Sequence, residues 1–343
     1  MGFGTGFEGR VILGPMSGYT TPCYRRFMER FGVAASVTEM VSASGLHYDP
    51  IGSGRFVEAS GIAPTGAQVF GADPERVAEG AEKALELEPR LSFIDINMGC
   101  PVKKVVRSRS GSALLDDPEL CGRIVSAVKE HVDVPVTAKI RLGRTAESVT
   151  WRTVVDALLR ADVDAVCIHT RTADQHYAGV ADHEAIRGLQ DKLPIPLIVS
   201  GDVFTAEDAA KAVETTGAEY VMVARGGVGN PFLMTQIDHL LEKGESLPNP
   251  SMSEQAKWCL ELMDAIIEES GPEIALGRMR GLGPKFLAGC RYSRDYRRAF
   301  TDRATDLDDM RMLLEKIGDE MGDAVFRSES GCRANIRKDE ARI

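Results

Sequence analysis

A single cysteine lies in a glycine-rich turn that directly follows a strand-like run. Residues 95–115 read DINMGCPVKKVVRSRSGSALL, with Cys100 between Gly99 and Pro101. A nucleophilic thiol needs an adjacent base, and a thiol of low pKa needs a helix N-terminus or cations. No histidine adjoins Cys100, and at an unperturbed pKa near 8.5 a thiol is mostly protonated at neutral pH. Cys100 is therefore a candidate proton donor; a nucleophile or a small buried side chain is the alternative.

Other polar residues interrupt apolar runs at similar places. Gln68 lies in the run 65–70, Lys139 in the run 135–141 and His169 in the run 164–170. Lysine is rarely buried in full without a partner, so Lys139 either meets an anion or lies at an exposed strand end. A histidine in an apolar strand is also common as a hydrogen-bonded core residue. The agreement of several such interruptions indicates a shared site.

The elements that must position these residues are eight apolar runs, at 11–16, 35–40, 65–70, 92–97, 135–141, 164–170, 195–200 and 219–225. Such runs are typical of parallel strands buried on both faces. Helix starts lie between them, with an aspartate N-cap and a proline at the first helical position in Asp73-Pro74 and Asp117-Pro118. The pattern predicts an α/β fold, a closed TIM (β/α)₈ barrel. An open doubly wound sheet is the alternative, but no G-x-G-x-x-G follows the first run.

In a TIM barrel the carboxyl ends of the strands form the active-site face. Gln68, Lys139 and His169 would there surround a flat, polar, anionic ligand, and flavin mononucleotide (FMN) fits that description. Its phosphate is expected at Ser200-Gly201-Asp202 and Ala224-Arg225-Gly226, because loops after strands 7 and 8 bind phosphate in many barrels. Glycines that only permit tight turns are the alternative. No spacing typical of a metal site occurs in the sequence.

The pattern changes after residue 247. A barrel domain at 1–247 is predicted to precede an all-helical domain at 251–321 and a flexible tail at 322–343. Eight basic and two acidic residues between 278 and 303 give a net charge of +6, although the whole chain carries −10. Interleaved aromatic residues suit stacking on splayed bases, so this stretch and the basic run after Cys100 predict an RNA-binding surface. A solvated helix face is the alternative.

Composition predicts the compartment. Seven cysteines without a C-x-x-C pair indicate a reducing cytoplasm. The N-terminus lacks the features of a signal peptide, and no apolar run is long enough to cross a membrane. We therefore expect a cytoplasmic protein, and a monomer.

Residues 11–235 contain a series of segments in the order and spacing of one enzyme family: GPMSGYTTPCYRRF, TEMVSASGL, DINMGCPVKKV with GSALL, VTAKIRLG, IHTRTADQHYAG, IVSGDV and VMVARGGVGNPF. They resemble the tRNA-dihydrouridine synthases, flavoenzymes that reduce uridine in tRNA. Lys103-Lys104 is similar to the bacterial B-type subgroup. Ser200 stands where the family usually has asparagine, and Ala173 and Ala224 also depart from its pattern.

The resemblance implies an FMN-binding barrel with a helical tRNA-binding domain, NADPH or NADH as electron donor, and Cys100 as catalytic proton donor. It assigns flavin contacts to Pro15, Met16, Ser17, Gln68, Lys139, His169, Gly201, Asp202, Ala224 and Arg225, and we add Ser200. The charge pattern assigns RNA contacts to Lys103, Lys104, Arg107, Arg280, Lys285, Arg291, Arg294, Arg297 and Arg298.

Two other functions remain open on the sequence. An FMN-dependent reductase of a small molecule, of the dihydroorotate dehydrogenase type, would use the same barrel with a thiol or hydroxyl in a similar loop. It would have no use for a basic helical domain. A non-redox RNA-binding protein would have no need of Cys100, Lys139 and His169.

Overall fold

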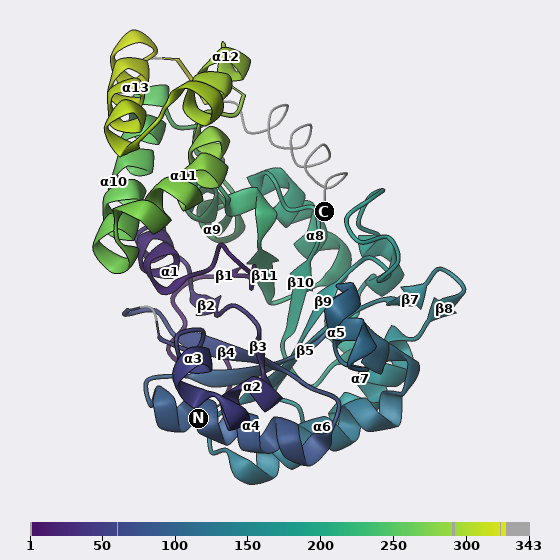
Figure 1. Cartoon of the computed structure of the whole chain (residues 1–343). Coiled ribbons are helices and arrows are strands. Elements are labelled where there is room, and N and C mark those ends of the chain that lie inside the picture. Colours follow the sequence, from purple (N-terminus) through teal and green to yellow (C-terminus); the bar gives the residue numbers. More distant parts are fainter. Residues whose placement is uncertain (1, 60, 290–291, 323, 327–343) are drawn as a thin grey trace. The chain divides into compact units, whose positions relative to one another are not determined.

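Parallel strands close into an eight-position barrel in the computed structural model of the chain, which describes residues 2–59, 61–289, 292–322 and 324–326 (Figure 1). One position is shared by two short strands, because β2 pairs with both β1 and β4 whereas β3 continues along β4. The β2–β4 pairing closes the ring and confirms the predicted TIM barrel. The strands are β1 (Val11–Leu13), β2 (Ala35–Val37), β3 (Val41–Ser42), β4 (Thr65–Phe70), β5 (Phe93–Met98), β6 (Val136–Arg141), β9 (Ala165–His169), β10 (Leu197–Ser200) and β11 (Tyr220–Val223).

The barrel interior is apolar near the amino ends of the strands. Ile12, Phe93, Cys167 and Met222 belong to one buried cluster there, and Phe3 and Phe7 of the N-terminal segment pack against it. Side chains alternate between the two faces of a strand. Residues two and four positions after Phe93 therefore also point into the barrel, nearer its carboxyl-end mouth. Apolar burial at one end stabilises the ring, and the other end is left for polar side chains.

Helices connect most of the strands. Asp73 caps α4 (Pro74–Leu87) by accepting from the Arg76 N–H, and Asp117 caps α6 (Pro118–His131) by accepting from the Leu120 N–H, as the sequence predicts. The other helices of the barrel portion are α1 (Pro22–Glu29), α2 (Ala43–Tyr48), α3 (Pro50–Gly54), α5 (Lys103–Arg107), α7 (Trp151–Arg160), α8 (Ala206–Thr216) and α9 (Leu233–Lys243). A hairpin of β7 (Gly143–Thr145) and β8 (Ser148–Val149) follows β6. Between β9 and β10, a stretch described throughout, the chain forms only 3₁₀ turns at His183–Ile186 and Gln190–Lys192.

The C-terminal region is helical, as predicted. It contains α10 (Met252–Ser270), α11 (Pro272–Phe286), α12 (Ser293–Arg298) and α13 (Leu307–Glu320). Ser251 and Glu254 form a capping box at the start of α10. None of the described helices combines the length and apolar composition that crossing a bilayer requires.

The chain divides into two compact units. The first comprises the residues up to Arg25, Val33–Asp202 and Ala210–Val223; the second comprises Arg26–Gly32, Val203–Ala209 and the described residues from Ala224 onward. The predicted domain limits at 247 and 251–321 stay predictions. Most of the tail predicted at 322–343 lies outside the described residues. Within its described part, Phe326 is buried and its N–H donates to the Pro250 carbonyl.

Glu88 at the end of α4 should make stability depend on acid pH. Hydrogen bonds from Arg90 and from the Ala59 N–H lower the pKa of Glu88 from 4.5 to about 2. A lowered folded-state pKa gives stability that is present above the unfolded pKa and is lost as pH falls from 4.5 toward 2. Glu88→Gln should cost about 2 kcal/mol of unfolding free energy at pH 7, after allowance for the exposed Arg90. Urea unfolding at pH 7 and pH 3.5 checks this, because a difference from wild type that does not shrink at pH 3.5 contradicts it.

Candidate active site

Two hydrogen-bonding groups hold the turn that carries Cys100. The Asn97 side-chain oxygen accepts from the Gly99 N–H at 3.2 Å and from the Cys100 N–H at 2.9 Å. On the other side, the Cys100 carbonyl accepts from the Ser112 N–H at 3.0 Å. Gly111 has φ +61°, and a Cβ there would lie 2.7 Å from the Cys100 carbonyl oxygen. The GSALL segment therefore needs glycine at this position to approach the turn.

The surroundings of Cys100 favour the neutral thiol. Burial raises the pKa of Cys100 above its ordinary value, and the Val102 N–H, Arg141 and Lys139 offset part of this rise. The thiol is half-buried. At neutral pH it therefore holds its proton, as a general acid must and an activated nucleophile must not.

A buried polar network crosses three neighbouring strands beneath the turn. In the parallel register Gln68 of β4 faces Asp95 of β5, and Asp95 faces Thr137 of β6. The Gln68 Nε2 donates to Asp95 Oδ2 at 2.7 Å, and the Thr137 hydroxyl donates to Asp95 Oδ1 at 2.6 Å. The Asn97 Nδ2 donates to Gln68 Oε1 at 2.8 Å. Gln68 thus joins the core of the barrel to the turn of Cys100.

Lys139 lies in the second half of β6, two residues before its end, and His169 is the last residue of β9. Lys139 is half-buried, and among the described residues its ammonium has no hydrogen-bond or ion-pair partner, although it interacts electrostatically with Cys100 and Asp95. His169 is buried, and its Nε2 lies 3.4 Å from a guanidinium nitrogen of Arg171. A half-buried cation without a protein partner is the kind of group that receives an anionic ligand.

Two buried arginines hold the segment 172–181, which takes the place of a helix after β9. Arg141 donates to the carbonyls of Thr172 and His176, both at 2.8 Å. Arg171 donates to the carbonyls of Ala178 and Gly179 and forms a 2.6 Å ion pair with Asp202.

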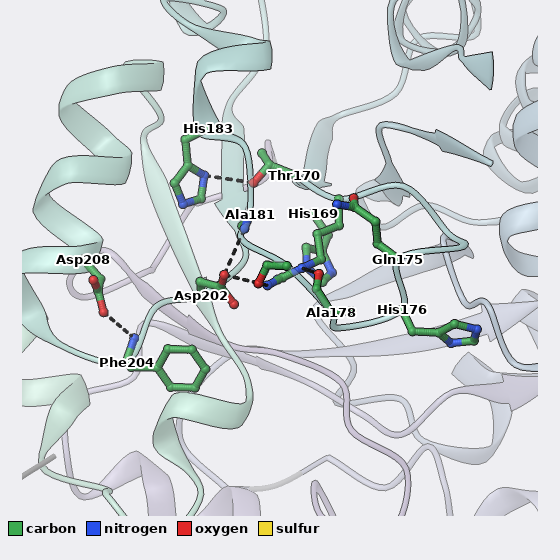
Figure 2. Close-up of polar contacts among 12 residues, drawn as sticks. His169, Thr170, Gln175, His176, Ala178, Ala181, His183, Asp202, Phe204 and Asp208 are labelled. Atoms are coloured by element: carbon green, nitrogen blue, oxygen red, sulfur yellow. Dashed lines mark hydrogen bonds and ion pairs between the residues drawn. The ribbon is translucent and has the colours of Figure 1, made fainter. Parts of the chain in front are cut away.

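The Asp202 carboxylate also joins this segment to the end of β10. It accepts from the Ala181 N–H at 2.9 Å, and Figure 2 shows this contact, with the His176 side chain pointing away from Asp202. Asp202 is therefore engaged within the protein through its carboxylate. A contact between Asp202 and a phosphate would therefore involve its backbone N–H rather than its carboxylate.

The remaining predicted cofactor residues lie at other strand ends. Pro15 and Met16 are half-buried after β1, whereas Ser17 is exposed. Ser200 ends β10, and Gly201 has φ +122°, with Ala181 Cβ only 2.8 Å from where a Gly201 Cβ would be. Ala224 and Arg225 directly follow β11 in the chain and belong to the second unit, where Arg225 lies 5.7 Å from the centre of the Phe204 ring.

Comparison with known proteins identifies the family. The family model described as "Dihydrouridine synthase (Dus)" matches residues 12–321. The chain belongs to the dihydrouridine synthase family. This confirms the resemblance stated on the sequence.

Two similar relatives of this family member carry related names. The "tRNA-dihydrouridine synthase B" of Pseudomonas aeruginosa is 35% identical over 300 residues, 87% of this chain and 90% of the relative. The "Probable tRNA-dihydrouridine synthase" of Rickettsia bellii is 36% identical over 263 residues, 76% and 80% of the two chains. Among solved structures, histamine dehydrogenase from Rhizobium sp. 4-9 has a TM-score of 0.53 at 15% identity. The superposition covers 68% of this chain and 46% of the histamine dehydrogenase chain. That likeness concerns the fold alone.

The basic residues predicted to contact RNA are mostly at the surface of this synthase-family chain. Lys103, Lys104 and Arg107 are exposed on α5. In the helical region Arg280, Arg294 and Arg298 are exposed and Lys285 and Arg297 are half-buried; Arg291 lies outside the described residues.

Asp95 and Thr137 were not among the polar residues expected at the site. Asn97, Arg141 and Arg171 lie at or just after strand ends, where the sequence predicts polar site residues, but no role was assigned to them. The position of Asp95 could have been predicted from the sequence. It lies two residues after Phe93 in the apolar run FIDIN, so its side chain points to the same inward face of the strand. The position of Arg141 at the end of β6 and of Arg171 just after β9 did not predict their contacts, since arginine is also common at the surface there.

Proposed function

We propose that this protein reduces the 5,6 double bond of uridine in tRNA to dihydrouridine, with FMN as cofactor and NADPH or NADH as electron donor. One observation carries the proposal: the half-buried Cys100 thiol, on a turn anchored by the Asn97 side chain, lies close enough to Lys139 to interact with its charge, and among the described residues this ammonium has no hydrogen-bond or ion-pair partner. The family membership and the names of the relatives support the same activity.

The residues at the mouth suit a flavin. Lys139 offers a positive charge to the pyrimidine edge of the ring system, and Gln68 has one N–H and one lone pair beyond those used by Asp95 and Asn97. Pro15, Met16, Ser17, His169 and Ser200 would supply further contacts, and the backbone of Gly201 and Asp202 would contact the phosphate. The phosphate contacts assigned to Ala224 and Arg225 on the sequence stay predictions. When bound and reduced, the flavin supplies a hydride for carbon 6 of the uracil ring.

Cys100 completes the reduction. Its S–H bond breaks as the proton moves to carbon 5 of uracil, and the thiolate left behind recovers a proton from solvent. The raised pKa of Cys100 keeps this proton on the sulfur between turnovers. The target base must leave its stack to reach the mouth, as in other enzymes that modify bases.

Exposed cations are proposed to hold the tRNA. Replacing Lys103, Lys104 and Arg107 of α5 together by alanine should weaken tRNA binding by about tenfold or more, and the slope of log affinity against log salt should fall by about 2 to 3. Filter binding over a salt series measures both. Arg123→Ala with Arg152→Ala, exposed cations of α6 and α7, is the control. Equal losses for the two variants would show that α5 has no special role.

Two observations test the function itself. Purified protein should be yellow and release FMN on denaturation; a colourless protein that does not take up FMN would exclude both flavin-dependent functions. Cells that lack the gene should contain less dihydrouridine in their tRNA. Flavin binding with unchanged tRNA would instead favour the small-molecule reductase. Location in the cytoplasm and a monomeric state stay predictions.

A further inference from the structure

A buried carboxylate, Asp95, lies in β5, the strand that leads into the turn of Cys100. Asp95 is 2% exposed, and each of its oxygens accepts one hydrogen bond, from Thr137 and from Gln68. It does not touch the turn. Through Gln68 and Asn97, however, it is joined to the N–H groups of Gly99 and Cys100 by hydrogen bonds of 2.7 to 3.2 Å.

We infer that Asp95 is a positioning residue, which sets the direction of the Gln68 and Asn97 side-chain amides and thereby holds the turn of Cys100. A carboxylate accepts hydrogen bonds, so the Gln68 NH₂ group must face Asp95. The Gln68 oxygen then faces Asn97, whose NH₂ group donates to it. This leaves the Asn97 oxygen for the two backbone N–H groups.

The opposite orientation of Gln68 is disfavoured at both ends. Its oxygen would face the carboxylate of Asp95, and its NH₂ group would face the NH₂ group of Asn97. Asn97 would keep only the weak acceptor Met40 Sδ, at 3.8 Å, as partner for its own NH₂ group. Because these groups are buried, leaving them unpaired is costly, and Asn97 would turn away from the N–H groups of the loop.

The relay does not depend on the charge of Asp95. Burial raises the pKa of Asp95, and a hydroxyl can accept as well as donate. A proton on Oδ1 would be donated to Thr137, and Oδ2 would still accept from Gln68. The direction of the amides is therefore the same for either protonation state of Asp95.

Asp95→Leu and Asp95→Asn test the inference. Leucine has a similar size but accepts no hydrogen bond. Asparagine can accept from Gln68 through its oxygen and donate to Thr137 through its NH₂ group. Hydrogen–deuterium exchange at the Gly99 and Cys100 amides should become about tenfold faster in Asp95→Leu and remain as in wild type in Asp95→Asn.

The catalytic consequence rests on the proposed function. In Asp95→Leu, kcat for tRNA uridine should fall by about tenfold to a hundredfold with KM for tRNA unchanged, because the proton donor is misplaced while the RNA-binding surface is intact. Asp95→Asn should restore most of kcat. Equal loss in both variants would assign the effect to charge, and unchanged exchange in Asp95→Leu would overturn the relay.

Two further variants serve as a control and as a substitute for Asp95→Leu in the exchange experiment. Asp164→Leu removes a carboxylate that accepts from the Val136 N–H at the other end of β6, and it should leave exchange at Gly99 and Cys100 unaltered. If Asp95→Leu does not fold, Gln68→Met interrupts the same relay one step later and should give the same faster exchange. If wild-type protein proves unable to reduce uridine, the proposed function fails, and the exchange comparison still decides the relay.

Discussion

Replacing Cys100 by alanine should lower the single-turnover rate of uridine reduction by about a hundredfold or more, with FMN still bound in full. Loss of a general acid has an effect of this size. The flavin contacts proposed here come from other residues, so the flavin spectrum and the rate of flavin reduction by NADPH should stay close to those of wild type. Rapid mixing of reduced protein with unmodified tRNA separates this chemical step from tRNA release.

Cys121→Ala is the matched control for that substitution. Cys121 is a buried thiol of α6 whose Sγ donates to the Leu114 carbonyl, and its loss should leave the rate of uridine reduction unchanged. A wild-type rate in the Cys100→Ala protein would remove the proton-donor role. A protein that loses its flavin together with the thiol would show that Cys100 mainly shapes the cofactor site.

Arg171→Met should destabilise the protein by about 3 to 5 kcal/mol, the usual cost of removing one partner from a buried ion pair. Arg171 is 1% exposed, and its loss leaves Asp202 without this charged partner and the Ala178 and Gly179 carbonyls without these donors. Urea unfolding measures the change, and proteolysis should cut the segment 172–181 first.

The exposed pair of Arg187 and Glu184 provides the comparison. Its atoms lie 2.5 Å apart, yet both side chains are more than half exposed, so Arg187→Met should leave the unfolding free energy nearly unchanged. If Arg171→Met were equally harmless, the segment 172–181 would have to be held by other contacts.

Local patterns predicted most of the frame. Continuous apolar runs marked the barrel strands because both faces of a parallel strand are buried, and Asp73 and Asp117 marked helix starts because a cap acts within three residues of itself. The division of the second strand position into β2 and β3 had no such local signal.

Contacts between distant residues could not be predicted in this way. The prediction of Asp202 as a cofactor residue did not include the ion pair of its carboxylate with Arg171, 31 residues earlier in the chain. The hydrogen bonds of Asp95 with Gln68 and Thr137 depend on the register of three strands, which the sequence of any one strand does not contain. Similarly, the carbonyls of Thr172 and His176 can accept hydrogen bonds from Arg141 because the segment after β9 forms no helix.

Reduction of tRNA uridine is measured most directly by incubating the FMN-loaded protein with NADPH and tRNA from cells that lack the gene, followed by mass spectrometry of the nucleosides. We expect a nucleoside heavier than uridine by two hydrogens, formed only when flavin and NADPH are present. Cys100→Ala should lower the initial rate of its formation about a hundredfold. FMN-loaded protein that oxidises NADPH but leaves every uridine of this tRNA unreduced would contradict the proposed function.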